Sequence, residues 1–427
     1  MSRIAEPYDY LFVGLGASAS LLLMSLDKRG LLDGRRIAVL EPAGKQDNDK
    51  TYCFWSRPEE SASADLGPLV SYAWGQVQVD GGAPQPLAPM AYRHIASLDL
   101  YRAARQVLAR HEIVQIAAAA LHVLPGNPAV VETADGNYRA RWVFDSRPPR
   151  FLPARANEVC LDQSFLGYRI RLAEGRFDTD VFEMMYFGVP QDGGTQFVYS
   201  LPYARDEALV ELTRFGRERL DPARAAVLLD AYICEQLGPY ERLETERGCI
   251  PMCSAIPDAD TGPGLVPLGT RAGLLKPSTG YGVKAMHAHA EQIAEALRQQ
   301  PDTCPPTALQ PRRQARFALY DRLLLLILAH WPGLGKPIFQ RLFRSSGAAQ
   351  GCASSTRPAA PARRCRCLRG CPGGLFCGRW VSSWVYGSGP CGAPCCCWHG
   401  WRPWLRSRLS RRVLHRHWAM AASCWAW

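Results

Sequence analysis

The sequence predicts an α/β fold of the Rossmann type, and three observations near the N-terminus support this prediction. Residues 8–14 and 36–40 are mostly apolar and are expected to form strands, while residues 17–29 between them are expected to form a helix. A glycine-rich turn joins the first strand to the helix, and an acidic residue follows the second strand. This strand–helix–strand alternation predicts two parallel neighbouring strands with a helix packed across them.

The glycine-rich turn reads GLGASA, and its Gly14, Gly16 and Ala19 match the G-x-G-x-x-G/A pattern of dinucleotide-binding proteins. Gly14 permits the tight turn, Gly16 lets the backbone approach a pyrophosphate, and the small Ala19 lets the helix pack closely on the strand. The helix N-terminus then presents its positive dipole end to the phosphates. Glu41, after the second strand, is placed to accept hydrogen bonds from a ribose diol. Glycine also serves ordinary tight turns, but the strand, helix and acid together favour a dinucleotide.

Two later segments favour FAD over NAD as the dinucleotide. Residues 130–144 read as a β-hairpin with an Asp-Gly turn, a feature that FAD-binding folds place after the first βαβ unit. Further on, Gly280 and Gly282 precede an amphipathic helix and offer a second set of backbone amides to the flavin phosphates or ring. Taken alone, this loop reads as an ordinary helix start, but the first motif beside it favours FAD. Tyr281 is expected either to stack near the flavin or simply to pack.

The formal net charge of +11 does not indicate a nucleic-acid partner. Residues 346–427 contain 12 Arg and no Lys, Asp or Glu, so the preceding residues carry 38 basic and 39 acidic groups, a net charge of −1. The N-terminus does not read as a charged and apolar leader, and the longest aliphatic run, residues 323–328, is far shorter than the ~20 residues that span a bilayer. We therefore expect a cytoplasmic protein, soluble or peripheral to a membrane, without a nucleic-acid partner.

Residues 346–427 differ from the rest of the chain. They hold 10 of the 16 cysteines and 8 of the 12 tryptophans, without an apolar period that predicts a helix or strand. GC-rich DNA read out of frame encodes such a composition, so we interpret this tail as frameshifted and disordered. A metal site and a basic arm for RNA or lipid are weaker alternatives, because a CCC run converges poorly on one ion and the arm rests on charge alone. No metal site is expected.

Seven segments of the chain resemble, in order, the bacterial lycopene β-cyclases. They read NDKTYCFW, VFDSRP, FVYSLPY, ALVELT, GCIPM, GTRAGLLKPSTGYG and YDRLLL. The most specific are KPSTGYG and NDKTYCFW, and the resemblance extends from about residue 8 to about residue 344.

The resemblance implies an FAD-binding fold of the kind found in p-hydroxybenzoate hydroxylase and glutathione reductase, with a mostly antiparallel β layer for the substrate. The domains expected from it are 1–150, the first part of the FAD-binding domain; 151–255, the substrate layer; 256–300, the closing part of the FAD-binding domain; 301–345, a helical segment; and 346–427, the anomalous tail.

The resemblance also implies an isomerase that cyclises the linear ends of lycopene to β-ionone rings, giving γ-carotene and β-carotene. In that family the flavin works in its reduced form, NAD(P)H only keeps it reduced, and the reaction has no net redox change. The carotenoid substrate is delivered from a membrane surface, so peripheral membrane association is expected. A flavin-dependent monooxygenase or polyprenyl reductase of the same fold, and a defective gene product without enzymatic activity, stay open as alternatives.

Glu211 in ALVELT matches the family motif that carries the essential carboxylate, and the resemblance therefore implies that Glu211 is the catalytic acid. Cyclisation needs a proton donor, and a carboxyl in an apolar pocket keeps its proton because burial raises its pKa. The pattern alone also fits a solvated strand face bearing Glu207 and Glu211. Asp145, at the end of a strand, is expected to bind the flavin or hold Arg147 rather than perform chemistry.

The chain departs from the family pattern at three places. Residues 163–168 read QSFLGY where Gln-His-Phe-x-Gly-Trp is usual, and Tyr186 replaces an expected aspartate, which puts activity and end-group specificity in doubt. The tail replaces further helices that cover the apolar tunnel in the family, and this loss is expected to promote aggregation.

His287 and His289, after the second glycine loop, are expected to be solvated.

Overall fold

The predicted strand–helix–strand unit is present in the computed structural model, which describes residues 6–149, 158–255, 257, 260, 262–301 and 315–346. Strands β1 (Tyr8–Val13) and β2 (Ile37–Leu40) pair in parallel, and α1 (Ala17–Asp27) connects them. All of β2 and four residues of β1 are buried, as expected for parallel strands covered on both faces. The predicted tail is residues 346–427, and all of it after Ser346 lies outside the described residues.

The first sheet extends this unit on both sides. Its order is β8-β2-β1-β11-β10-β9, and β17 also pairs with β11. The predicted hairpin is confirmed, because β10 and β11 pair in antiparallel fashion, while the second half of β11 runs parallel to β1 and β17. The added strands are β8 (Val114–Ile116), β9 (His122–Leu124), β10 (Ala129–Thr133), β11 (Gly136–Asp145) and β17 (Leu265–Pro267).

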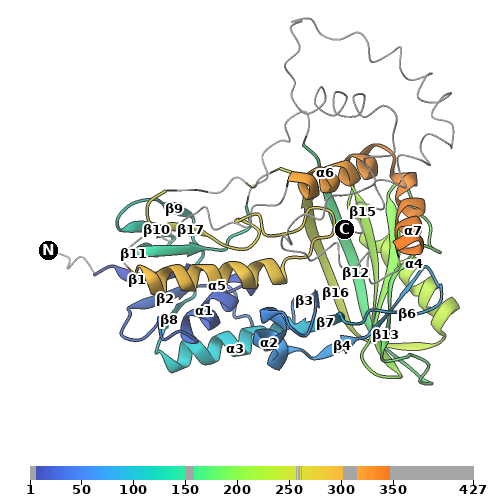
Figure 1. Ribbon diagram of the computed structural model, residues 1–427, viewed down its shortest axis with the longest axis horizontal. Helices are drawn as coiled ribbons and strands as arrows, with labels where there is room; N and C mark the ends of the chain where they lie inside the picture. Colours follow the sequence, from blue (N-terminus) through green and yellow to red (C-terminus); the bar gives the residue numbers. More distant parts are fainter. Residues whose placement is uncertain are drawn as a thin grey trace, which may run out of the picture. The chain divides into compact units, whose positions relative to one another are not determined.

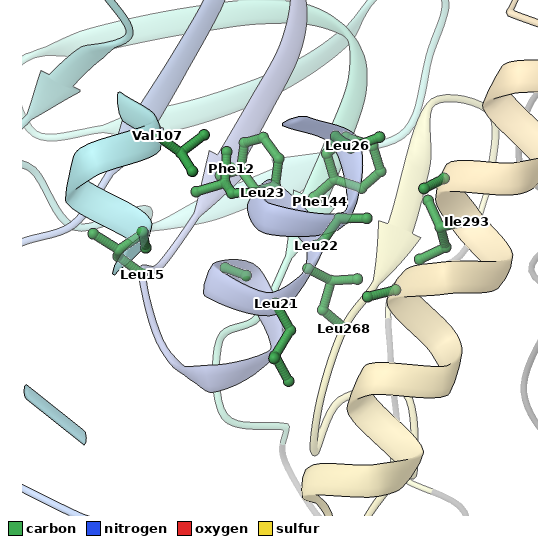
Figure 2. Close-up of a cluster of buried hydrophobic side chains, with 14 of the residues drawn as sticks. Phe12, Leu15, Leu21, Leu22, Leu23, Leu26, Val107, Phe144, Leu268 and Ile293 are labelled. Carbon is green, nitrogen blue, oxygen red and sulfur yellow. The ribbon is translucent and has the colours of Figure 1, made fainter. Parts of the chain in front are cut away.

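Three helices cover one face of the parallel strands in Figure 1: α1, α3 (Ser97–Arg110) and α5 (Val283–Gln299). Leucines of α1 lie in the middle of the resulting core, and Figure 2 shows Phe144 of β11 and Ile293 of α5 packed around them. Two short helices complete this region, α2 (Ser61–Leu66) and the 3₁₀ turn η1 (Gly67–Leu69). The core holds the N-termini of α1 and α5 in place, and these are the two helices that follow the glycine loops.

The expectation that His287 and His289 are solvated is wrong, because each side chain is buried. Helix α5 contacts α1, α2 and β3, so more than one of its faces is covered. His287 Nε2 lies 3.0 Å from Asp65 Oδ2 of α2, and burial lowers the pKa of His289 to about 4. Both imidazoles are therefore parts of the helix packing.

The second sheet is large and mostly antiparallel, in the order β16-β12-β15-β14-β13-β5-β6, and only β13 and β5 pair in parallel. Helix α4 (Pro222–Tyr232), capped by Asp221 and continued by the π-helical turn η2 (Ile233–Leu237), covers one face. The other face is left for the site described below. The strands are β5 (Gln76–Val79), β6 (Gln85–Pro86), β12 (Cys160–Leu172), β13 (Val181–Tyr186), β14 (Thr195–Pro202), β15 (Glu207–Gly216) and β16 (Tyr240–Cys253).

A small third sheet and two C-terminal helices complete the described residues. The sheet has the order β3-β7-β4, formed by β3 (Thr51–Ser56), β4 (Tyr72–Trp74) and β7 (Ala91–Ala96). The helices are α6 (Ala315–His330) and α7 (Gly335–Ser346), joined by the 3₁₀ turn η4 (Pro332–Leu334). Within the described residues, no single helix has the length and apolarity of a membrane span; Phe317–His330 and Pro332–Phe343 meet those criteria only together, across a bend of 118°.

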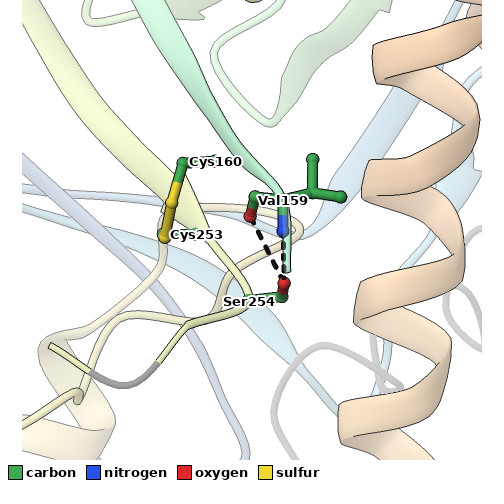
Figure 3. The surroundings of a disulfide bond; sticks show 4 residues. All are labelled: Val159, Cys160, Cys253 and Ser254. Carbon is green, nitrogen blue, oxygen red and sulfur yellow. Dashed lines mark hydrogen bonds between the residues drawn. A yellow bond between two sulfur atoms is a disulfide. The ribbon is translucent and has the colours of Figure 1, made fainter. Parts of the chain in front are cut away.

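A disulfide bond joins the ends of β12 and β16, a feature that the sequence did not predict. Figure 3 shows Cys160 bonded to Cys253, with Val159 and Ser254 beside them. The Val159 N–H donates a hydrogen bond to Ser254 Oγ at 2.9 Å, and the Ser254 hydroxyl donates to the Val159 carbonyl at 3.3 Å. The two strands that border one side of the site are thus tied together at one end.

Candidate active site

Two acidic side chains lie at one level on the face of the second sheet opposite α4. In the strand register, Gly167 of β12 is opposite Glu211 of β15 on one side and opposite Glu246 of β16 on the other. Because side chains alternate along a strand, Val210 and Leu212 point to the opposite face and pack toward α4. The carboxyl groups therefore flank a position without a side chain.

Glu211 is buried, with 9% of its surface exposed, so it does not lie on a solvated strand face. Glu207 has the surface role instead and pairs with Arg169 and Arg171. Burial, together with the charge of Glu246, raises the pKa of Glu211 to about 8, although the Thr213 hydroxyl donates a hydrogen bond to Glu211 Oε1 at 2.6 Å. The Glu211 carboxyl is thus mostly protonated at neutral pH, as the predicted catalytic acid must be.

Glu246 was not predicted from the sequence as a site residue. The Thr51 hydroxyl of β3 donates a hydrogen bond to Glu246 Oε2 at 2.8 Å. Burial raises the pKa of Glu246, while the hydrogen bonds from Thr51 and the charge of Lys50 oppose that rise. Its strand, YERLETERGCIPMC, is rich in charged residues like an ordinary exposed strand, so only the pairing with β12 reveals the position.

A chain of three tyrosine hydroxyls connects this face to the second glycine loop. Tyr199 of β14 is opposite Glu211 in the register, and its hydroxyl donates to the Tyr92 hydroxyl at 2.5 Å. The Tyr92 and Tyr281 hydroxyls share a further hydrogen bond of 3.0 Å. Burial raises the pKa of Tyr92 and of Tyr199 well above the usual range, so both stay neutral. Tyr281, predicted on the glycine loop, is thereby brought to the acidic pair.

Aromatic rings form a wall beside these hydroxyls, between the second and third sheets. The ring of Tyr92 stacks on Phe182 with centroids 4.6 Å apart and lies 4.3 Å from Trp55. Trp74 contacts the same group, and its indole N–H donates to the Pro202 carbonyl at 3.0 Å. No spacing in the sequence predicted this wall, because its members come from four separate strands. All four rings are almost fully buried and pack against one another, so the wall is apolar and closed to water.

The predicted dinucleotide residues form a cradle at the start of α1. Gly14 has φ = +89°, and a Cβ there would lie 2.5 Å from Ser146 Oγ, so the turn requires glycine. A Cβ at Gly16 would meet nothing within 4 Å, which leaves open space in front of the helix N-terminus. Ala19 is fully buried in the helix–sheet core. Glu41 accepts a hydrogen bond from the Leu15 N–H at 2.7 Å through Oε2.

The second glycine loop adds an unpaired acceptor. Gly280 has φ = +72°, and a Cβ there would lie 3.0 Å from Gln163 Oε1. That oxygen is buried and has no hydrogen-bond partner among the residues that the structure describes. Gly282 directly precedes α5. Open backbone at the start of α1 and an orphaned buried oxygen beside Gly280 both fit a dinucleotide with a polar ring system, so the residues present fit FAD.

Two other acidic clusters have structural partners. Asp145 is bound by Arg147 at 2.8 Å and Arg271 at 3.3 Å, in agreement with the expected structural role. Asp65, His287 and Glu291 offer ligand atoms within 4.8 Å of one another, as a metal site would. Arg29 and Lys28 already neutralise these carboxylates, so we propose no metal there.

The raised pKa of Glu211 predicts that the free energy of unfolding falls as the pH rises. Its pKa is about 8 in the folded chain against an ordinary value of 4.5, so between these values the folded chain binds more protons than the unfolded chain. The free energy of unfolding should therefore decrease from about pH 5 to about pH 8, by up to a few kcal/mol. Glu246 acts in the same direction.

Replacing Glu211 by Gln should make this dependence shallower, which urea denaturation of the parent and the variant at both pH values will measure. A dependence of equal steepness in the two proteins would show that Glu211 is not the proton-binding group.

Comparisons with known proteins agree with these features. Residues 9–349 match the family model described as lycopene cyclase protein. Two relatives named lycopene beta-cyclase are similar to this chain. That of Pseudescherichia vulneris is 29% identical over 364 residues, which cover 78% of this chain and 89% of the relative. That of Pantoea ananas is 27% identical over 294 residues, which cover 67% of this chain and 74% of the relative. The crystal structure of p-nitrophenol 4-monooxygenase from Pseudomonas putida superposes with a TM-score of 0.57 at 14% identity, covering 80% of this chain and 94% of that one, and it supports the fold alone.

Proposed function

The chain belongs to the lycopene cyclase family, and from that premise we propose that it closes the linear ends of lycopene into β-ionone rings, giving γ-carotene and β-carotene. The observation that supports this most is the buried Glu211, a carboxyl that keeps its proton at neutral pH and lies beside Tyr199, whose ring contacts the aromatic wall. An acid of this kind starts carbocation chemistry without help from water.

The proposed reaction conserves all atoms and electrons. Glu211 donates its proton to the terminal double bond of one end of lycopene, which leaves a tertiary carbocation. The next double bond of the chain attacks this carbon and forms the ring C–C bond. Loss of a proton from the new ring then yields the ring double bond, so the hydrogen count does not change. Trp55, Trp74 and Phe182 are almost fully buried and pack against one another, so they keep water out of this side of the site.

We propose FAD as the cofactor, held at its phosphates by Gly14 and Gly16, at its ribose by Glu41 and near its ring by the loop of Gly280, Tyr281 and Gly282. Bound in its reduced form, which NAD(P)H maintains, the flavin supplies an electron-rich surface that stabilises positive charge. The hydrogen bond between Tyr281 and Tyr92 orients the loop toward the acidic pair. A turnover consumes no reductant under this proposal.

An assay of the purified chain with FAD, excess NAD(P)H and lycopene, without oxygen, tests the proposal. We expect cyclic carotenoids, identified by chromatography, while the nicotinamide is not consumed in step with product. Consumption in step with product would identify a polyprenyl reductase, and a product formed only with oxygen would identify a monooxygenase. A protein that retains no flavin and forms no product would support the non-enzymatic alternative.

We further propose that the protein works at the cytoplasmic membrane surface, where lycopene dissolves. Three large apolar side chains support this, Leu323 in α6 and Trp331 and Leu334 at the α6–α7 bend, which are 45%, 56% and 41% exposed. The Cys160–Cys253 disulfide is unusual for a cytoplasmic protein, and mass measurement after thiol alkylation of freshly lysed cells will establish its redox state there.

Replacing Trp331 and Leu334 together by Ser should weaken vesicle binding by roughly 10-fold or more, because each apolar side chain contributes on the order of 1 kcal/mol on burial. Turnover of lycopene in vesicles should fall accordingly, while turnover of lycopene in detergent micelles should not. Val227→Ser on α4, where the side chain is 60% exposed, is the matched control. Equal vesicle sedimentation of all three proteins would argue against docking at this bend.

A further inference from the structure

The acidic pair of Glu211 and Glu246 is separated by a position that carries no side chain. Adjacent strands lie about 4.8 Å apart, so the two α-carbons are about 10 Å apart across β12. The three strands β16, β12 and β15 lie side by side in Figure 1. A Cβ at Gly167 would lie 3.2 Å from Leu209 Cδ1 and 3.4 Å from Glu211 Cβ, so a larger residue would crowd the sheet face between the carboxyls. Glycine therefore lets the side chains of Leu209 and Glu211 pack closely against the strand between the two carboxyls.

The two carboxyls have different surroundings. Glu211 is more deeply buried and accepts one hydrogen bond, from the Thr213 hydroxyl. Glu246 is partly exposed and accepts hydrogen bonds from both the hydroxyl and the backbone N–H of Thr51, with the positive charge of Lys50 nearby. When one proton is shared by such a pair, it resides on Glu211, and the negative charge resides on Glu246. The pair is thus set up as one acid and one base.

We propose that Glu246 is the base of the reaction and accepts the proton that the cyclised cation loses, after Glu211 has donated the first proton. This inference rests on the proposed cyclase function. The ring C–H bond breaks, its electron pair becomes the ring double bond, and the proton passes to Glu246. Transfer of that proton back to Glu211 restores the starting state, so no oxidant, reductant or further reactant is needed. Placement of the base on one side of the substrate then selects which ring carbon loses its proton.

Glu246→Gln tests the proposal, because Gln keeps the acceptor oxygen for Thr51 but is not basic. We expect the variant to bind FAD and to melt like the parent, and to cyclise lycopene about 10²-fold more slowly or worse. Since Glu211 still forms the cation, the residual product should contain rings whose double bond lies at another position. Glu244→Gln is the matched control, on the same strand two residues earlier, where the side chain is exposed and pairs with Arg169.

The pH profile gives a second readout, which a merely structural role would not change. The rate of the parent should fall at low pH as Glu246 becomes protonated; this fall is the acidic limb of the pH profile. The rate of Glu246→Gln should not show this limb. Thr51→Val removes one hydrogen bond to Glu246 and should shift the limb to higher pH, which keeps the test valid even where Glu246→Gln folds poorly. The other ionisable groups around the pair are Asp49 and Cys53 on the β3 side and Tyr199 and Tyr203 on the β14 side.

The outcomes separate this inference from the proposed function. A parent chain that forms no ring at all contradicts the function. In a second outcome, the parent cyclises lycopene, and Glu246→Gln has a rate within about threefold of the parent, forms the same rings and shows the same fall in rate at low pH. That outcome would overturn the role of Glu246 as the base and leave the proposed function intact.

Discussion

Replacement of Glu211 by Gln is expected to reduce cyclisation by about 10³-fold, because the amide has no proton to donate and general acids contribute 10²–10⁴-fold to rate. The substitution keeps the size of the side chain and an oxygen that can accept from Thr213, so the fold should persist. Product formed from lycopene by equal amounts of flavin-loaded parent and variant, separated by chromatography, gives the ratio.

Glu207→Gln is the control for this prediction. Glu207 stands at the start of the same strand, and its carboxylate pairs with Arg169 and Arg171 near the surface, where such pairs contribute about 1 kcal/mol or less. Its rate should stay within about twofold of the parent. A Glu211→Gln protein that binds flavin and retains a tenth or more of the parent rate would remove Glu211 from the role of acid.

Gly16→Asp is expected to abolish flavin binding without unfolding the chain. Gly16 is the N-cap of α1 with φ = −81°, and a Cβ there meets nothing within 4 Å, so the residue fits sterically. Aspartate is a favoured N-cap, so the melting temperature of the flavin-free protein should stay equal or rise. The new carboxylate opposes the phosphates that the cradle would hold, at a cost of several kcal/mol, so FAD should bind at least about 100-fold more weakly.

The flavin absorbance per chain after gel filtration measures this change. Gly67→Asp provides the comparison, because Gly67 also has a negative φ and open space around it but lies near the C-terminal end of α1, where Asp65 pairs with Lys28. It should retain as much flavin as the parent. Full flavin content in a folded Gly16→Asp protein would mean that the cofactor does not approach the start of α1.

Predictions from local sequence agreed closely with the structure. The turn at Gly14 needs a positive φ, the helix start needs an open backbone, and the following strand needs continuous apolar residues, and each requirement is met within a few neighbouring residues. The hairpin of β10 and β11 was predictable for the same reason, since its Asp-Gly turn and alternating strands are adjacent. Solvent exposure on α5 was less predictable, because His287 and His289 are buried by segments distant in the sequence.

The sequence by itself determined the strand–helix–strand unit with its glycine turn and, through the resemblance, singled out Glu211 as the candidate acid, because these depend on short motifs. Only the tertiary structure decided that Glu246 lies level with Glu211 across Gly167, and that Tyr92 and Tyr199 connect this level to Tyr281. The physical reason is that alternation along a strand specifies which face a residue occupies but not which strand becomes its neighbour. Strand pairing between distant segments supplies that information, and with it the surroundings that set the pKa of each carboxyl.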